Sequence, residues 1–367
     1  MAKHHPENER IKRQYFTYLE EARRMAPSSV DQVAASIALF EKSSGHRSFK
    51  AFHIEQAKKF KRDLDGMTNP KTGKPLAKST IHSRLMALKT FVQWLAGQPG
   101  YKSRISYPDA DYFNSSANDT RIAKAEREKH VPTLEQIHHV LDTMPTATVL
   151  DRRDRALIAF TLLSGARDDA IASLKIRHVN LDKRRVDQDA REVRTKNRKS
   201  FVSWFFPVCR EVELIVTSWI EELKTDHLFG PDNPLFPATK VDVDGNGHFA
   251  PVGIKREGWS SAAAIRRIFK ERFEAAGLPY FNPHSFRNTL VQLGEKQCRT
   301  PEEFKAWSQN LGHEQVLTTL ASYGAVARDR QREIMAQIGA APTDTGAFSP
   351  EVLAMADKLV KAGIGTP

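Results

Sequence analysis

The sequence predicts a mainly α-helical protein with one small β-sheet, arranged in two modules. Before residue 110 the apolar residues recur at helical spacing and no strand alternation is visible. After residue 130 the helical patterns continue, but short β-rich segments such as FVSWFF at 201–206 interrupt them. Between these stretches, residues 114–130 are polar, charged and poor in large apolar side chains, which is typical of a linker.

The first module, residues 1–113, is predicted to be entirely helical. Its four expected helices lie at about 9–25, 28–45, 52–66 and 77–100. Gly45 and Gly66 end the second and third of them, as glycine commonly does at a helix C-terminus. The fourth carries an apolar face made of Ile81, Leu85, Leu88, Phe91 and Val92. We expect this face to point into the core of the module.

The second module, residues 131–340, is predicted to mix helices with a few short strands. Helices are expected at 132–144, 156–163, 208–224, 261–276, 283–295, 301–310 and 314–337. Two or three strands are expected near 184–187, 191–196 and 201–206, and an irregular excursion at 238–260. A tail at 341–367 holds one more amphipathic helix, with Ser349 as N-cap and Pro350 at its first position.

Composition limits the classes of function. The chain has 367 residues and a net charge of +12, which favours a polyanionic partner such as DNA, RNA or an anionic membrane surface. No run of 18 apolar residues occurs and the N-terminus lacks an apolar stretch, so we expect neither a membrane span nor a signal peptide. The two cysteines lie far apart, which excludes a zinc ribbon or a disulfide scaffold and fits a cytoplasmic protein.

Two stretches carry basic residues in places where they could bind an anion. Arg167 in LLSGARDDA follows a buried helix and a glycine, although it could simply pair with Asp168 or Asp169 at the surface. The segment 191–200 lies at a predicted hairpin tip, which would suit contact with phosphates, although a solvated turn is the commoner fate of such a run. Its basic residues are Arg191, Arg194, Lys196, Arg198 and Lys199.

A third stretch, NPHSFRNTLVQLG at 282–294, reads as a helix start with Asn282 as N-cap. Phe286, Leu290 and Leu293 mark its inward face. His284 and Arg287, three residues apart on another face, could reach one ligand together, whereas a lone histidine more often satisfies a backbone carbonyl.

Two further candidates follow in the segment NLGHEQVLTTLASYG. His313 comes directly after Gly312 and would sit at a helix start. Tyr323 could be a nucleophile or simply a half-buried core phenol.

In this order the five motifs resemble the tyrosine recombinase (phage integrase-type) family. The matching residues are Arg167 in SGAR, Lys196 in TKNRK, His284 and Arg287 in PHSFR, His313 in LGH and Tyr323 in SYG. The resemblance covers roughly residues 9–340, and it implies a four-helix (SAM-like) core-binding domain followed by an α+β DNA breaking-rejoining catalytic domain.

The sequence departs from the family's pattern in two places. Ala170 stands where the family usually has an acidic residue, whose orienting role Asp169 could take. The spacing from His313 to Tyr323 is also one residue longer than the commonest one. Lys199, on the same predicted hairpin as Lys196, is an alternative for the family's lysine.

The resemblance implies a site-specific recombinase that joins a DNA 3′-phosphate to Tyr323 without metal, ATP or another cofactor. Arg167, Arg287 and His313 would hold the phosphate, His284 would take the phenol proton, and Lys196 would protonate the leaving 5′-oxygen. Arg191, Arg194, Arg198 and Lys199 would contact the DNA backbone.

The family's reaction also implies partners. These are double-stranded DNA and three further copies of the chain in a homotetramer on two duplexes, with the tail helix docking on a neighbour or on its own domain. A bacterial, phage or mobile-element origin is expected. The alternatives are a DNA-binding accessory protein that lost catalysis and a type IB topoisomerase-like enzyme.

Overall fold

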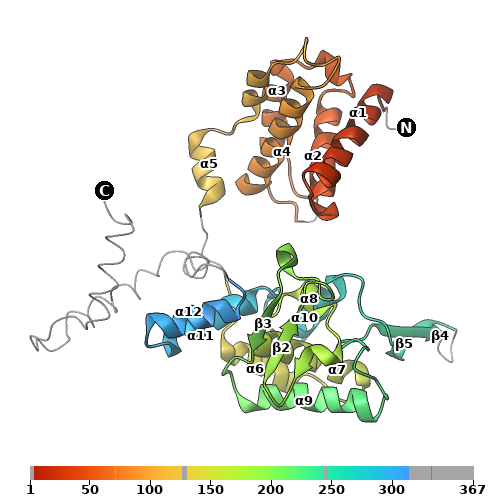
Figure 1. Cartoon of the computed structure of the whole chain (residues 1–367), viewed down its shortest axis with the longest axis vertical. Helices are drawn as coiled ribbons and strands as arrows, with labels where there is room; N and C mark the ends of the chain where they lie inside the picture. Colours follow the sequence, from red (N-terminus) through yellow and green to blue (C-terminus); the bar gives the residue numbers. More distant parts are fainter. Residues whose placement is uncertain (1–3, 71, 126–129, 244–246, 314–331, 333–367) are drawn as a thin grey trace, which may run out of the picture. The chain divides into compact units, whose positions relative to one another are not determined.

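The computed structural model describes residues 4–70, 72–125, 130–243, 247–313 and 332. The chain divides into two compact units, residues 1–127 and 128–367, and each is treated below by itself. Helices dominate both units, and the named strands within the described ranges belong to the second one (Figure 1). This agrees with the predicted fold class, which is mainly helical with little sheet.

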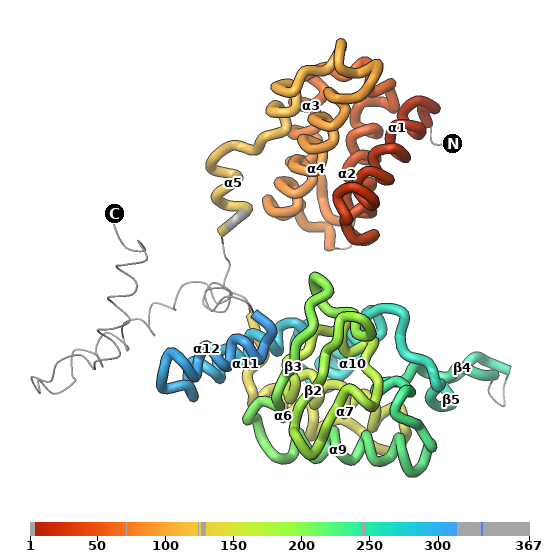
Figure 2. The backbone as a smooth tube through the Cα atoms, in the orientation of Figure 1, coloured from red at the N-terminus to blue at the C-terminus, as the bar shows by residue number. Residues whose placement is uncertain are grey.

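The first unit is a helical bundle (Figures 1 and 2). Its helices are α1 (Pro6–Thr17), α2 (Pro27–Ser43), α3 (Ile54–Asp65), α4 (Lys78–Ala96) and α5 (Ala117–Lys124). Helix α4 packs against α2, α3 and α5, so it forms the middle of the bundle. The predicted apolar face of α4 is confirmed, since Leu85, Leu88 and Phe91 are all buried.

Aromatic side chains fill the core of this unit. The ring of Phe40 lies 5.5 Å from that of Phe60 and 5.6 Å from that of Phe113, both edge-on. Tyr15 is buried against Phe91, and burial raises the pKa of its phenol to about 12. Edge-to-face packing of this kind adds roughly 0.5–1.5 kcal/mol per pair beyond area burial.

Part of the predicted linker is folded, which corrects the sequence analysis. Residues 117–124 form α5, which begins at Ser116, whose hydroxyl accepts from the Asp119 amide. An ion pair between Lys78 and Asp119 and one hydrogen bond between His82 and Ser115 connect this region with α4. A polar composition therefore did not mark a structureless segment, because the stabilising contacts are themselves polar.

The second unit is built around one buried helix. Its helices are α6 (Leu134–Thr143), α7 (Val149–Ser164), α8 (Asp168–Ile171), α9 (Arg210–Thr225), α10 (Ala263–Ala275), α11 (Ser285–Gln297) and α12 (Pro301–Asn310). Helix α7 starts with a capping box between Thr148 and Asp151 and is buried from residue 156 to its end. It packs against α6, α9, α10 and α11.

The sheet of the second unit is small and antiparallel. Strands β1 (Val179–Asn180), β2 (Arg185–Gln188) and β3 (Phe201–Trp204) lie in that order, and Gln188 pairs with Phe201 where the β2–β3 connection begins. The predicted strand at 191–196 is wrong. Those residues lie in the connection, which continues into a 3₁₀ turn, η5 (Lys196–Arg198), where Asn197 and Arg198 have φ of 59° and 51°.

The predicted irregular excursion at 238–260 is also wrong. It contains a two-stranded hairpin, β4 (Thr239–Val243) and β5 (Phe249–Ile254), which projects from the rest of the unit (Figure 2). The Gly, Asp and Pro residues of this segment are uncommon in strands, so the sequence did not predict one. Pro251 is tolerated because it lies in an edge strand, where its missing amide is not needed for pairing. The helices predicted at 314–337 and in the tail lie outside the described residues.

Candidate phosphate-binding site

The centre of the candidate site is the guanidinium of Arg287 on α11. The helix begins at Ser285 with His284 as its N-cap residue, so the predicted N-cap at Asn282 is wrong, although Asn282 Oδ1 still accepts from the Ser285 amide just before the helix. Phe286 and Leu290 are buried on the inward face, as predicted. Arg287 is only 2 % exposed, so the helix carries a positive charge into the interior of the unit.

Two backbone carbonyls hold this guanidinium. Arg287 Nη1 donates to the carbonyl of Gly165, and Nη2 donates to the carbonyl of Leu311. In the ranges that the structure describes, Arg287 has no carboxylate partner and its Nε has no acceptor. Burial, together with the charge of Arg167, lowers the pKa of Arg287 to about 9, so it remains charged at pH 7. A buried cation without an acid is costly unless an anion joins it.

Two glycines shape the walls around Arg287. Gly165 ends α7 with φ +60°, and a Cβ there would lie 2.9 Å from the ring of Phe206 and 3.0 Å from Leu311. Gly312 has φ +71°, and its Cβ would lie 2.8 Å from the ring of Phe201. Only glycine fits both the backbone and the space, and these turns bring residues 167 and 313 to the same pocket.

Arg167 occupies the position just before α8. It is half-buried, and burial lowers the pKa of its guanidinium. Asp168 binds Arg266 at 2.7 Å and Asp169 binds Arg194 at 3.0 Å, so both carboxylates that were considered as partners of Arg167 are taken. The backbone carbonyl of Arg167 accepts from the Ile171 amide, but over the described ranges its side chain has no hydrogen bond or ion pair, which leaves the guanidinium available for an external anion.

His313 completes the buried part of the site. Its Nε2 lies 3.1 Å from Arg287 Nη2. Since arginine can only donate, this nitrogen must accept, and a neutral ring then carries its proton on Nδ1. The pKa of His313 falls to about 4 because of burial and, next, the charges of Arg287, Arg167, His284 and Lys196. The imidazole is therefore neutral at pH 7.

The two exposed candidates, His284 and Lys196, are close enough to His313 for their charges to lower its pKa. His284 is exposed directly before α11, and Lys196 is exposed in η5. Both act on His313, so five of the six predicted catalytic residues gather in one region. Tyr323, the sixth, lies outside the described residues.

The other predicted DNA-binding residues divide into two groups. Arg191 binds Asp189, whose pKa this arginine holds well below its usual range, and Arg194 binds Asp169. Arg198 is exposed and Lys199 is half-buried. Arg191 and Arg194 are thus paired with carboxylates in this structure, and the contact of these four residues with DNA stays a prediction.

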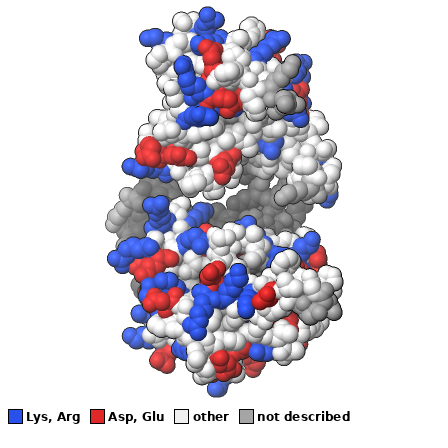
Figure 3. Space-filling view, turned by 90° about the vertical axis from the view of Figure 1, so that its right-hand side faces the viewer, with Lys and Arg blue, Asp and Glu red and all other residues white. Residues whose placement is uncertain are grey.

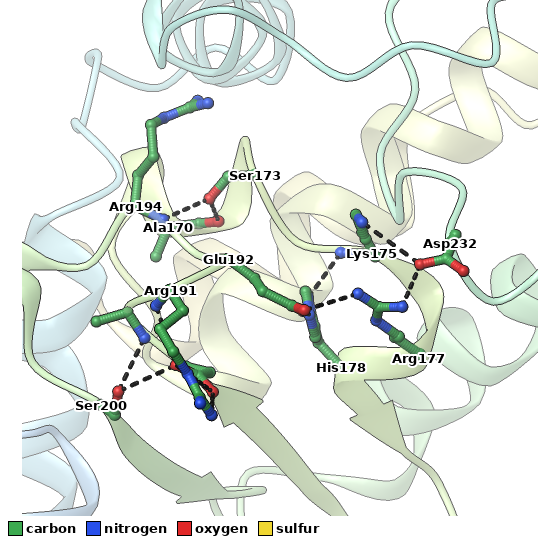
Figure 4. A network of polar contacts seen from close by, with 12 residues as sticks. Ala170, Ser173, Lys175, Arg177, His178, Arg191, Glu192, Arg194, Ser200 and Asp232 are labelled. Carbon is green, nitrogen blue, oxygen red and sulfur yellow. Dashed lines mark hydrogen bonds and ion pairs between the residues drawn. The ribbon is translucent and has the colours of Figure 1, made fainter.

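A polar network that the sequence did not reveal fixes the base of the β2–β3 connection (Figure 4). Glu192 accepts from Arg177 at 2.9 Å and lies 2.8 Å from Nε2 of the buried His178. Asp232 in turn binds Arg177 and Lys175. The only hint in the sequence was that Glu192 is an acidic residue inside a basic segment. Its partners His178 and Arg177 lie 14 and 15 residues away in sequence, so they could not be identified without the fold.

The side of the molecule shown in Figure 3 is not uniformly basic. On the side shown in Figure 3, lysines and arginines alternate with acidic side chains in both units. Over the residues described, no cluster of three or more His, Cys, Asp or Glu could hold a metal ion. No helix there is long and apolar enough to cross a membrane.

Comparison with known proteins defines the class. Residues 131–330 match the sequence profile of the phage integrase family, which is more than half of the chain. The protein therefore belongs to the phage integrase family, the tyrosine recombinases. The comparison with curated protein sequences gives no match.

Two solved structures illustrate the shared fold. The Tn1549 transposon integrase (residues 82–397, Y379F), in complex with transposon right end DNA, has a TM-score of 0.56 at 16% identity, and the match covers 89% of this chain and 99% of that one. A lambda integrase (75–356) dimer bound to a COC′ core site has a TM-score of 0.58 at 12% identity, covering 86% and 94%. At such identities the likeness shows the fold alone.

Proposed function

We propose that the protein is a site-specific DNA recombinase that cleaves and rejoins duplex DNA through a 3′-phosphotyrosyl intermediate. One observation carries this proposal: Arg287 and Arg167 form a positively charged cluster with His313, and no carboxylate neutralises either guanidinium among the residues described. A cluster of this kind suits a phosphodiester, because guanidinium groups match phosphate oxygens bidentately and keep their charge.

Tyr323 is the proposed nucleophile. Its phenol oxygen attacks the scissile phosphorus, a new bond joins phosphorus to that oxygen, and the bond to the 5′-oxygen breaks. His284 accepts the phenol proton, whose ordinary pKa is about 10. Lys196 donates a proton to the leaving 5′-oxygen, and Lys199 is the alternative donor. One phosphodiester replaces another, so the step needs no ATP, metal or cofactor.

The guanidiniums of Arg167 and Arg287 stabilise the charge that grows on the non-bridging oxygens. His313 adds a hydrogen bond from its neutral ring. Loss of one such donor costs about 3–4 kcal/mol of transition-state stabilisation. Arg287 is held by two carbonyls before substrate arrives, so little reorganisation is needed.

Both units take part in DNA binding in this proposal. Residues 1–113 form the core-binding domain, 114–130 the linker and 131–340 the catalytic domain. In the first unit, α2 and α4 flank a groove of about 520 Å³ lined by Gln32, Ser79, Thr80, Ser83 and Arg84, among others. Such side chains can donate to base edges and phosphates. The matched Tn1549 and lambda integrase structures are complexes with transposon end DNA and with a core site, which supports DNA as the partner.

The proposed assembly is a homotetramer on two DNA duplexes in the cytoplasm. The proposed origin of the protein is a bacterium, a phage or another mobile element. The tail at 341–367 would dock on a neighbouring catalytic domain or on its own. Removing residues 341–367 should reduce assembly on DNA without changing cleavage of a single site. Unchanged assembly would exclude docking on a neighbouring subunit and leave docking on its own domain.

A suicide DNA substrate, nicked so that the cleaved 5′ fragment diffuses away, tests the proposal. The chain should form a covalent protein–DNA adduct, and Tyr323→Phe should not. Failure to form any adduct on DNA that the protein binds specifically would favour the accessory-protein alternative. Recombination between two defined sites separates a recombinase from a type IB topoisomerase, because relaxation of supercoils alone does not.

A further inference from the structure

The β2–β3 connection, residues 189–200, has a fixed base and an exposed tip. All four of Glu192, Arg194, Lys196 and Arg198 are exposed, but only Glu192 and Arg194, at the base, form side-chain hydrogen bonds or ion pairs with other parts of the described unit. A lysine that delivers a proton must sit within about 3 Å of the leaving oxygen. The contacts at the base of this connection therefore determine where Lys196 can reach.

Arg194 makes three hydrogen bonds to other parts of the unit, and two of their acceptors lie in α8 or directly after it. Its amide donates to Ser173 Oγ at 2.9 Å, its Nε donates to Asp169 Oδ1 at 3.0 Å, and its Nη2 donates to the Trp259 carbonyl at 3.1 Å. The Ser173 hydroxyl in turn donates to the Ala170 carbonyl at 2.9 Å. Figure 4 shows Arg194 beside Ser173 and Ala170.

The ion pair between Arg194 and Asp169 connects the segment that carries Lys196 with the segment that carries Arg167, and each of the paired residues is close in sequence to one of them. Arg194 precedes Lys196 by two residues, and Asp169 follows Arg167 by two residues. A two-residue span extends no more than about 7 Å. The ion pair between Arg194 and Asp169 thus ties the loop of the proposed proton donor to the backbone that presents a phosphate-binding arginine.

We propose that Arg194 is a positioning residue for Lys196 and that Asp169 is its anchor. The inference rests on the function proposed above. It replaces two sequence-based expectations, namely that Arg194 contacts a DNA phosphate and that Asp169 orients Arg167. A displacement of about 1 Å at a reacting group can cost roughly 100-fold in rate, so loss of the anchor slows proton donation without removing the donor.

The test compares two cleavage substrates in single-turnover adduct formation. One carries the normal 5′-oxygen at the scissile phosphate, and the other carries a 5′-bridging sulfur. A thiolate leaves without a proton, because a thiol has a pKa near 8.5. A defect in proton donation therefore slows cleavage of the oxygen substrate and largely disappears with the sulfur substrate.

Four variants give the readout. Asp169→Asn and Arg194→Ala should cleave the oxygen substrate about 10- to 100-fold more slowly and the sulfur substrate within about threefold of the wild-type rate. Lys196→Ala should show the same pattern and serves as the benchmark. Lys183→Ala, which removes an exposed charge in the turn between β1 and β2, should cleave both substrates normally.

Asp169→Asn also separates positioning from DNA contact. If Arg194 bound a phosphate, freeing it from Asp169 would leave cleavage intact and raise DNA affinity, with a steeper salt dependence. That outcome would overturn the inference. Equal slowing of both substrates by Asp169→Asn and Arg194→Ala would also overturn it, because the defect would then lie in phosphate binding or folding.

The benchmark distinguishes failure of the inference from failure of the proposed function. If sulfur rescues Lys196→Ala but not Arg194→Ala, the positioning role is wrong and the proton donor stands. If sulfur does not rescue Lys196→Ala, the assignment of the proton donor is wrong, and the positioning role falls with it. Asp169 is exposed, so its substitution by the isosteric Asn should leave the fold intact.

Discussion

Replacing Gly165 by alanine should destabilise the second unit and disable its phosphate pocket. Gly165 has φ +60°, and an added Cβ would lie 2.9, 3.0 and 3.1 Å from Phe206, Leu311 and Leu290, all of them buried. A left-handed alanine costs about 1–2 kcal/mol. Overpacking of a filled core costs about 1–3 kcal/mol more. The expected loss is therefore about 2–5 kcal/mol, a large share of a typical stability of about 5–15 kcal/mol.

The matched control is Gly277→Ala. Gly277 has φ +74°, and nothing lies within 4 Å of its Cβ position. This variant should therefore show only the backbone cost of about 1–2 kcal/mol. Urea unfolding of both variants, followed by a probe in the second unit, measures the two losses. If Gly165→Ala loses no more stability than Gly277→Ala, the packing argument for the pocket wall is wrong.

Three further predictions concern the charges of the site. Arg287→Ala should abolish DNA cleavage while leaving DNA affinity within a few-fold, as measured by adduct formation and by titration; a large loss of affinity with residual cleavage would contradict it. Sulfate should raise the thermal midpoint of the protein by mass action, and less so for Arg167→Gln; equal shifts for both would place the anion elsewhere. The pKa of His313 is depressed to about 4 from an ordinary value of 6.5. The unfolded chain therefore takes up a proton first, so stability contributed by the neutral ring is complete above pH 6.5 and is lost as pH falls from 6.5 toward 4. His313→Gln should flatten that part of the stability–pH curve, and an unchanged slope would refute the assigned pKa.

Much of the fold and site could be predicted because the signals are local. The helical spacing on α4 predicted its buried face, and on α11 it predicted the burial of Phe286 and Leu290. It did not predict the burial of Arg287, and the helix begins after His284, two residues later than the N-cap predicted at Asn282. Arg167, Arg287 and His313 follow from short motifs that each include or adjoin a glycine or a proline. Each motif determines the backbone over a few residues. The order of the motifs along the chain was therefore enough to propose that Arg167, Arg287 and His313 lie close together.

The remaining features depend on contacts between distant residues. The partner of Asp169 is Arg194, 25 residues along the chain, and neither residue shows this in its own surroundings. The segment 191–196 has the composition of a strand, yet Asp189 and Glu192 bind side chains that draw it into a loop. In β4 and β5 the cross-strand pairing overrides the turn-forming residues.

The central claim is that this pocket holds a DNA phosphate while Tyr323 attacks it. The most direct measurement is the yield of covalent adduct on a suicide substrate, with Tyr323→Phe and Arg287→Ala compared at equal occupancy of the DNA. The account predicts a phosphotyrosyl adduct at Tyr323 for the native chain and none for either variant. An adduct at another residue, or undiminished adduct with Arg287→Ala, would contradict it.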